Sequence, residues 1–256
     1  MRYTRLNLHY FVEAILRIHL LDVLRGAMVL AMIIYHFFWD LGYFKFIDQK
    51  NITQGVPLLI AQCIGASFII ISGISFKLAS LSGNFKKKFL KRIGVLLVIC
   101  LLITLITFFL DKKSFIFFGI IHLLATCSFI GLLLSRIKKN YLLFVLFLFS
   151  LIPSVSKIKY DFPIYISWLG LNSEIPTTND FYPLFPWVSF YVFGLWACKP
   201  LRNFIAAKNK NSLINYYKFI NIYGGLQFLG RNSLTVYILH QPIFFSLFLI
   251  FISIRS

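Results

Sequence analysis

The stretch IGVLLVICLLITLITFFL at residues 93–110 decides the fold class. Its 18 residues carry no charge, and a helix needs about 20 predominantly apolar residues to cross the roughly 30 Å of hydrocarbon in a bilayer. The apolar residues form one continuous run and do not alternate with polar ones, which indicates a helix and not a barrel strand. We therefore expect this segment to cross a membrane as an α-helix.

Further segments of the chain share this character. Together they give seven predicted spans, at residues 23–43, 52–76, 93–110, 114–135, 140–156, 181–198 and 232–254. Apolar residues make up 59% of all 256 residues and charged residues 13%, whereas a soluble domain averages about 45–50% apolar and about 25% charged residues. These proportions exclude a soluble globular enzyme and a disordered chain. We predict an all-α fold, a polytopic transmembrane helical bundle of about seven spans.

The basic residues alternate between successive connecting segments. Of 26 Lys and Arg residues, 19 lie in the N-terminal tail to Arg25 and in the segments 77–92, 136–139 and 199–231. Cytoplasmic segments of membrane proteins accumulate Lys and Arg, so this alternation predicts a cytoplasmic N-terminus, a C-terminus outside and an odd number of spans. The same rule accounts for the net charge of +18, and we expect no binding of nucleic acid.

The sequence shows no internal repeat that would divide it. We expect residues 1–20 to form a cytoplasmic or interfacial N-terminal segment, because the mixed polarity of residues 6–20 is typical of an amphipathic helix on a membrane surface. Residues 21–256 are predicted to form a single transmembrane domain. The cysteines and histidines lack the paired spacings of metal ligands, so the sequence predicts no metal site.

Ionisable residues share one face of the first predicted span. At 100° per residue, Asp22, Arg25, His36 and Asp40 fall within an arc of about 60°. Arg25 then lies near the cytoplasmic boundary and His36 beyond the midplane, about 16 Å further along the helix. Asp40 lies one turn after His36 and could hydrogen-bond an imidazole nitrogen to fix its tautomer. Such residues inside a membrane indicate a functional site, and the alternative is a polar contact that clamps two helices.

Two further histidines lie inside predicted spans, His122 in the fourth and His240 in the seventh. Histidines in three separate helices favour a shared polar cavity, in which His36 and His122 could meet. Tyr237 lies on the same face of its helix as His240. The alternative is that each histidine forms a hydrogen bond that packs two helices together.

The start of the sixth predicted span is rich in aromatic residues. Asp180 precedes it, and Tyr182 and Trp187 lie in its first turns. The aromatic side chains fit the interfacial belt of a membrane protein. A sugar-binding rim is the other interpretation, because sugars stack on aromatic rings and hydrogen-bond to carboxylates.

Several stretches resemble one known family, the bacterial membrane proteins grouped with heparan-alpha-glucosaminide N-acetyltransferase. They occur in the expected order and extend over residues 19–245. The stretches are LDVLRG at 21–26, YHFFWDL at 35–41, GIIH at 119–122, DFYPLFPW at 180–187 and LGRNSLTVYILHQP at 229–242. The spacing from Arg25 to His36 is also similar to that in acyltransferase-3 membrane enzymes.

The resemblance implies an acyltransferase with a helical fold around a path across the bilayer. An acetyl or other acyl group would pass from cytosolic acyl-CoA, the donor substrate, to a hydroxyl or amine of a sugar on the outer side. The acceptor would be a glycan or glycolipid. Size and composition point to a bacterial inner (cytoplasmic) membrane, and the sequence leaves the oligomeric state open.

The residues can be assigned roles in this reaction. Arg25 and Arg231, both at the cytoplasmic boundary, would bind the phosphates of CoA, because guanidinium groups pair bidentately with phosphate. Asn232 is assigned to the same donor site. His36, oriented by Asp40, would act as general base on the acceptor. A covalent acyl-histidine on His36 is the variant of this mechanism.

Further residues are assigned to the tetrahedral intermediate and to the acceptor. The oxyanion would accept hydrogen bonds from His122 or His240, with Asn232 and Tyr237. The residues predicted to bind the acceptor are Asp180, Tyr182, Trp187 and Tyr237.

Two other function classes use the same residues. In a proton-coupled transporter or channel, the histidines and aspartates would form a proton relay, and flux would depend on pH. In a membrane subunit without catalytic activity they would only hold helices together. Mutation of His36 or His122 would then reduce the stability of the protein and would not cause a loss of activity.

Overall fold

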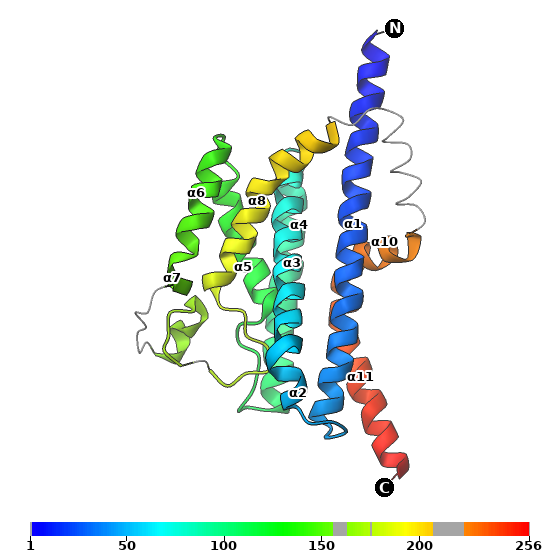
Figure 1. Ribbon diagram of the computed structural model, residues 1–256, viewed down its shortest axis with the longest axis vertical. Coiled ribbons are helices and arrows are strands. Elements are labelled where there is room, and N and C mark those ends of the chain that lie inside the picture. Colours follow the sequence, from blue (N-terminus) through cyan, green and yellow to red (C-terminus); the bar gives the residue numbers. More distant parts are fainter. Residues whose placement is uncertain (1, 156–162, 175, 207–222, 256) are drawn as a thin grey trace. The chain divides into compact units, whose positions relative to one another are not determined.

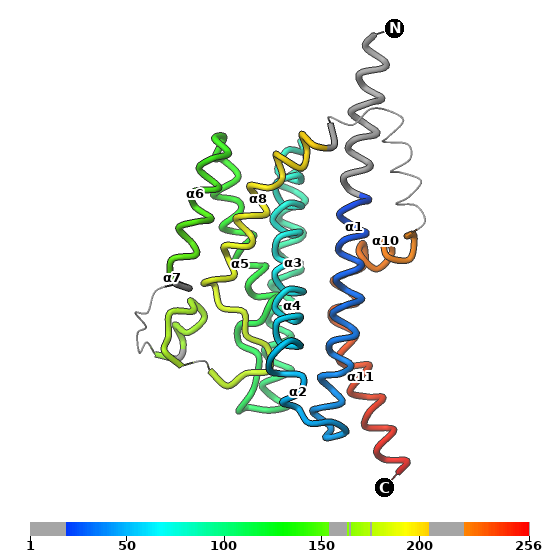
Figure 2. Tube along the Cα trace, viewed as in Figure 1, coloured from blue at the N-terminus to red at the C-terminus, as the bar shows by residue number. Residues whose placement is uncertain are grey.

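The computed structural model describes residues 2–155, 163–174, 176–206 and 223–255 (Figures 1 and 2). As predicted, the fold is all-helical, and these ranges contain no strand. Phe118 and Phe181 form an isolated β-bridge. The helices are α1 (Arg2–Tyr43), α2 (Lys50–Thr53), α3 (Gly55–Ser80), α4 (Phe85–Leu110), α5 (Ile120–Leu134), α6 (Asn140–Ser150), α7 (Ile152–Val155), α8 (Leu184–Ala206), α10 (Gly224–Arg231) and α11 (Ser233–Arg255), with a 3-10 helix at Ile164–Leu169.

Within the described ranges, four helices are long and apolar enough to cross a membrane, which makes this a membrane protein. They are His19–Tyr43 within α1, and the whole of α3, α4 and α11. The other apolar helices, α5 and α6, are shorter. In α8, Phe185 has a non-helical backbone and Pro200 lies inside the helix. Seven spans and the orientation of the termini therefore remain predictions.

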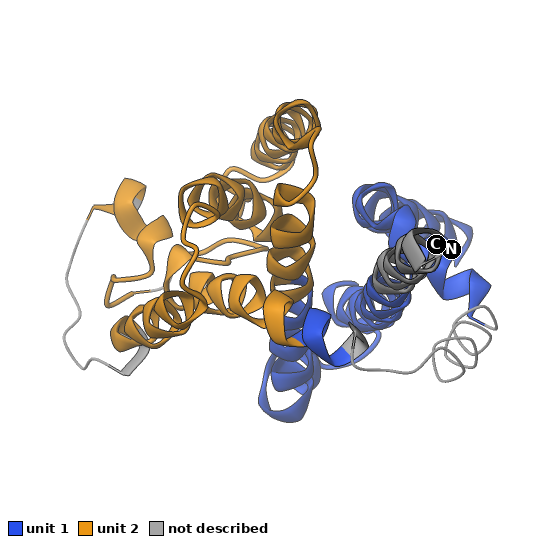
Figure 3. Ribbon diagram, turned by 90° about the horizontal axis from the view of Figure 1, so that it is seen from above, with its two compact units in different colours: residues 1–68, 201–256 blue, residues 69–200 orange. Residues whose placement is uncertain are grey.

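The helices form two compact units (Figure 3). Unit 1 contains residues 1–68 and 201–256, and unit 2 contains residues 69–200. Unit 1 thus combines α1 and the start of α3 with α10 and α11 from the end of the chain. Unit 2 contains the rest of α3 and the helices α4 to α8 up to Pro200.

Glycines allow α10 to lie directly on α1 in unit 1. A Cβ atom on Gly26 would overlap the carbonyl oxygen of Leu226, and one on Gly230 would overlap the carbonyl oxygen of Asp22. Both obstacles are backbone atoms, so no side-chain rotation could make room. Close approach through small residues is typical of membrane helices, which gain little from burying apolar surface against each other.

Aromatic side chains join α11 to the second half of α1 and to Phe44, which directly follows α1. The rings of Phe37 and Phe244 have their centres 5.8 Å apart, and those of Phe44 and Phe248 are stacked at 5.1 Å. Pairs at such distances contribute beyond the apolar area that they bury. α10 therefore packs against one part of α1 and α11 against the next part. The polar residues of α1 occur in both parts.

The same principle of close packing organises unit 2. A Cβ atom on Gly73 of α3 would overlap the carbonyl oxygen of Tyr191 in α8, and one on Gly194 would overlap that of Ile70. Almost completely buried side chains come from three helices of this unit: Ile69 of α3, Leu123 of α5, and Tyr191 and Leu195 of α8. The core of unit 2 thus lies between α3, α5 and α8.

Candidate functional site

A cluster of charged residues lies where α10 crosses α1. The Asp22 carboxylate accepts a hydrogen bond from Arg25 Nη1 at 2.9 Å and pairs through its other oxygen with Arg231 Nε at 3.3 Å. Arg25 Nη1 also lies 3.4 Å from the carbonyl oxygen of Gly230. Asp22, Arg25 and Arg231 are called the arginine cluster below. It brings together the two arginines that the sequence assigned to one site.

The arginine cluster keeps an excess of positive charge, because one carboxylate faces two guanidinium groups. The Asp22 side chain is only 10% exposed, whereas the Arg231 side chain is 55% exposed. Next to the cluster, His19 Nδ1 lies 3.0 Å from Gln227 Oε1. The same nitrogen lies 3.4 Å from Arg231 Nη2, so His19 contacts two residues of α10. Exposed guanidinium N–H groups held in place by a buried carboxylate suit a phosphate group.

Two histidines face each other between α1 and α11. The ring centres of His36 and His240 lie 4.8 Å apart with an interplanar angle of 79°. His36 Nδ1 lies 2.9 Å from the Met32 carbonyl oxygen, and His240 Nδ1 lies 2.6 Å from the Tyr237 carbonyl oxygen. A carbonyl only accepts, so each Nδ1 carries a hydrogen and Nε2 of each neutral ring presents a lone pair. His36 and His240 are called the histidine pair.

Asp40 does not take the position that the sequence predicted. Its Oδ1 accepts a hydrogen bond from Gln241 Nε2 at 3.3 Å, across to α11. The carbonyl of Met32 therefore sets the tautomer of His36, in place of Asp40. The physical reason is that the i−4 carbonyl lies within reach of the imidazole on the same helix face, while the neighbouring helix offers Asp40 an amide.

His122 has hydrogen bonds at both ring nitrogens. Its Nδ1 accepts from the backbone N–H of Gly119 at 3.3 Å, and its Nε2 lies 3.1 Å from Thr104 Oγ1. The Thr104 hydroxyl donates to the Ile116 carbonyl at 2.9 Å, so its oxygen accepts from His122 Nε2–H. His122 thus has the tautomer opposite to that of the histidine pair. It caps the start of α5 and joins α5 to α4.

Asp180 and Tyr182 also hold the start of α5 within unit 2. Asp180 Oδ2 accepts the backbone N–H of Ile120 at 3.1 Å. A carboxylate is favoured at a helix N-terminus, where backbone N–H groups lack partners. The backbone N–H of Tyr182 donates to the Phe118 carbonyl at 3.1 Å, and the rings of Tyr182 and Trp187 have centres 4.7 Å apart. These contacts give the three residues a structural role at α5 and leave their predicted binding of an acceptor as a proposal.

Asn232 lies between α10 and α11, and Tyr237 lies in the second turn of α11. Asn232 Nδ2 donates to the Phe228 carbonyl at 2.9 Å, which satisfies a carbonyl group near the end of α10. The Tyr237 ring centre lies 5.6 Å from that of His240. Tyr237 therefore belongs with the histidine pair, and Asn232 follows Arg231 at the junction of the two helices.

The predicted residues divide between the two units, and those of unit 1 form two groups along α1. Unit 1 holds the arginine cluster with Asn232 next to it, and the histidine pair with Asp40 and Tyr237. Unit 2 holds His122, Asp180, Tyr182 and Trp187. The prediction that His36 and His122 share a cavity stays a prediction. Sequence reasoning missed Gln241, although an amide directly after His240 in an apolar helix is a signal that could have found it.

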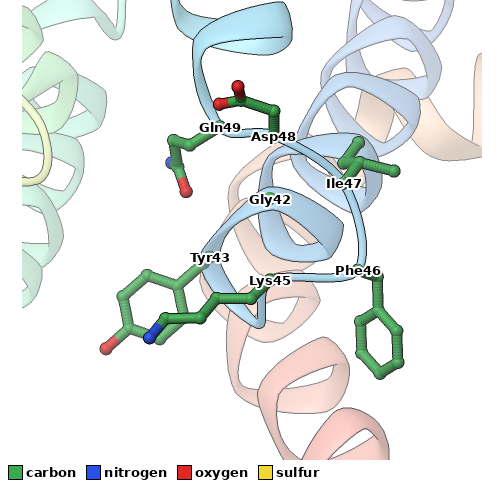
Figure 4. Close-up of a pocket in the computed structure, with 7 residues that line it drawn as sticks. All are labelled: Gly42, Tyr43, Lys45, Phe46, Ile47, Asp48 and Gln49. Atoms are coloured by element: carbon green, nitrogen blue, oxygen red, sulfur yellow. The ribbon is translucent and has the colours of Figure 1, made fainter.

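An open pocket of about 530 Å³ lies where the chain turns from α1 into α2 (Figure 4). Its polar lining comes from Lys45, Asp48 and Gln49, and Tyr43 and Phe46 add aromatic rings. None of the predicted site residues lines it. Within the described ranges, no group of three or more His, Cys, Asp or Glu residues could hold a metal ion.

Comparison with known proteins identifies one family. The model of the family described as heparan-alpha-glucosaminide N-acetyltransferase, catalytic, matches residues 17–242. No curated protein and no solved structure matches the chain. The matched range contains the arginine cluster, the histidine pair and the residues around the start of α5.

Proposed function

Because the chain belongs to the heparan-alpha-glucosaminide N-acetyltransferase catalytic family, we propose that it transfers an acetyl or other acyl group from cytosolic acyl-CoA to a sugar. The acceptor is a hydroxyl or amine of a glycan or glycolipid at the outer side of the membrane. We place the protein in the inner membrane of a bacterium. Its membrane-crossing helices and its family both support an acyltransferase that works within a bilayer.

The observation that carries this proposal is the histidine pair. Acyl transfer requires a group that removes the proton of the acceptor as the new bond forms. His36 presents a lone pair at Nε2 because its Nδ1–H is held by the Met32 carbonyl. His36 is therefore the general base, and its partner in α11 keeps the ring in place.

His240 gives the pair a property that a single histidine lacks. Two positively charged imidazoles with ring centres 4.8 Å apart would repel each other strongly in an apolar environment. At most one of the rings carries a charge, so the pair titrates as a unit and retains one neutral base. Neutral His240 has no N–H left for an oxyanion, and this role passes to its protonated form or to the Tyr237 hydroxyl.

The arginine cluster is the proposed binding site of the CoA phosphates. Arg231 supplies an exposed guanidinium group, and Asp22 fixes the position of both arginines without neutralising them. Asn232 follows Arg231 and holds the end of α10 through Phe228. The acyl thioester is bound further along α1, toward His36.

Release of CoA from labelled acetyl-CoA by the purified protein in liposomes tests the proposal. We expect the wild type to release CoA and to transfer label to a glycan or lipid acceptor, and His36→Ala to do neither. Phe38→Leu, an exposed neighbour on the same helix, is the matched control and should retain activity. Retained turnover in His36→Ala would refute the role of the base.

The same preparation separates the competing function classes. Without CoA release over a broad panel of acceptors, flux driven by a pH gradient would indicate a proton-coupled transporter. If His36→Ala lowers the unfolding temperature in detergent while the wild type shows neither turnover nor flux, the histidines serve only to hold helices together.

A further inference from the structure

The Asp40 carboxyl group lies deep in unit 1, and none of the described residues forms an ion pair with it. The residue is 0% exposed, and it belongs to the part of α1 that can cross a membrane. Its Oδ1 has one hydrogen bond, from Gln241 Nε2 at 3.3 Å, while its Oδ2 is buried without a hydrogen-bond partner in the described structure. An ionised carboxylate in this position would lack the compensation that buried charges require.

Charged groups on the elements packed against α1 lie elsewhere, as far as the structure describes them. In α11, His240 donates its Nδ1–H to the Tyr237 carbonyl. In α2, Lys50 is exposed. In α10, Arg231 is paired with Asp22, about five helical turns back along α1. On α1 itself, His36 directs its Nδ1–H to the Met32 carbonyl.

Gln241 provides the complementary half of this arrangement. Its Oε1 is also buried without a partner in the described part of the chain, while its Nε2 faces Asp40 Oδ1. A neutral carboxylic acid has one acceptor oxygen and one O–H donor, and a primary amide has one N–H donor and one acceptor oxygen, in the same fork geometry. A proton on Asp40 Oδ2 would therefore satisfy both unpartnered oxygens at once.

We propose that Asp40 holds a proton at neutral pH and forms a reciprocal pair of hydrogen bonds with Gln241. In this acid–amide pair, Gln241 donates to Oδ1 and the Asp40 O–H donates to Gln241 Oε1. The pair joins α1 to α11 without placing a charge in the membrane. It is a proton-binding site one turn from His36, and it stands whether or not the protein transfers acyl groups.

Infrared spectroscopy of the purified protein at neutral pH tests the proposal directly. The chain has only 8 Asp and Glu residues, so the carbonyl-stretching band of a protonated carboxylic acid can be assigned. We expect this band in the wild type and its loss in Asp40→Asn. Asp22→Asn is the matched control and should keep the band, because Asp22 pairs with two arginines. Absence of the band from the wild type, or its persistence in Asp40→Asn, would overturn the proposal.

A second set of variants tests the reciprocal hydrogen bonds. In Gln241→Leu the acid loses its amide partner, so the band should persist and move to a higher frequency. This variant also assigns the band if Asp40→Asn does not fold. In the double variant Asp40→Asn with Gln241→Glu, acid and amide exchange places, and the band should return from the new glutamic acid. An unshifted band in Gln241→Leu, or no band in the double variant, would show that the pair does not form.

Discussion

Replacement of Gly230 by alanine tests the contact that builds the arginine cluster. The new Cβ atom would overlap the Asp22 carbonyl oxygen and lie 3.0 Å from Asp22 Cα. Because backbone atoms cannot rotate away, α10 must move off α1 by on the order of 1 Å, at a cost of about 1–3 kcal/mol. The better helix propensity of alanine offsets up to about 1 kcal/mol of this. A shift of that size would break the contacts of Arg231 with Asp22 at 3.3 Å and of Arg25 with the Gly230 carbonyl at 3.4 Å.

The assay compares thermal unfolding in detergent with CoA binding for Gly230→Ala and for the control Gly225→Ala. Gly225 lies in the same helix, and a Cβ atom there meets nothing within 4 Å. For Gly230→Ala we expect the unfolding temperature to fall by about 2–8 °C, and CoA to bind roughly tenfold more weakly as one charge-assisted hydrogen bond is lost. Gly225→Ala gains only the helix propensity of alanine, so it should unfold at or slightly above the wild-type temperature and bind CoA as the wild type does. Unchanged unfolding of Gly230→Ala would refute the close contact, and unchanged CoA binding despite lower stability would place the donor site elsewhere.

Asp22→Asn leaves Arg25 and Arg231 without their shared counter-charge, so stability should fall by about 1–3 kcal/mol in denaturant titrations. A stability equal to wild type would mean that solvent already screens the cluster. In His122→Gln the hydrogen bonds to Gly119 and Thr104 cannot both form, so the free energy of unfolding should fall by about 1–2 kcal/mol. Loss of turnover at an unchanged unfolding temperature would instead support a catalytic role. Hydrogen bonds from the Ser114 hydroxyl and a backbone N–H hold the pKa of the exposed Asp111 below its usual range. The turn therefore gains stability above the unfolded pKa of about 3.9 and loses it as the pH falls through the lower folded pKa. Asp111→Asn should flatten this acid branch of the unfolding profile, and an unchanged branch would contradict the assignment.

The helical class could be predicted from the sequence because hydropathy along a membrane helix is a local property. Residues 93–110 lie in α4, but this helix begins at Phe85. The earlier residues include four lysines and one arginine, which a helix carries outside the hydrocarbon and which a count of apolar residues therefore omits. In the fourth predicted span, α5 begins only at Ile120. Asp180, 60 residues further along the chain, caps its N-terminus, and no local pattern reveals such a partner.

The site could be predicted from the sequence where its residues lie on one face of a single helix. Helical periodicity placed Arg25 and His36 on one face of α1, where Arg25 also contacts α10 and His36 also contacts α11. The partner of Asp40 was not predictable, because the register between α1 and α11 is a tertiary property. The i+4 spacing made His36 the obvious choice, but the backbone carbonyl of Met32 competes for the same imidazole nitrogen. Asp40 therefore accepts its hydrogen bond from Gln241 on the neighbouring helix.

The two groups of unit 1 lie on one continuous helix, and this bears on how an acyl donor could be used. Arg25 and His36 are eleven residues apart in α1, so the helix sets their separation along its axis at about 16 Å. α10 holds the first end through glycine contacts, and α11 holds the second through aromatic rings. A phosphate bound at the arginine cluster and a base at the histidine pair would therefore keep a constant spacing. An extended donor with its phosphates at one end and its reactive carbonyl at the other fits such a spacing, because the rigid helix orients both ends without a conformational change.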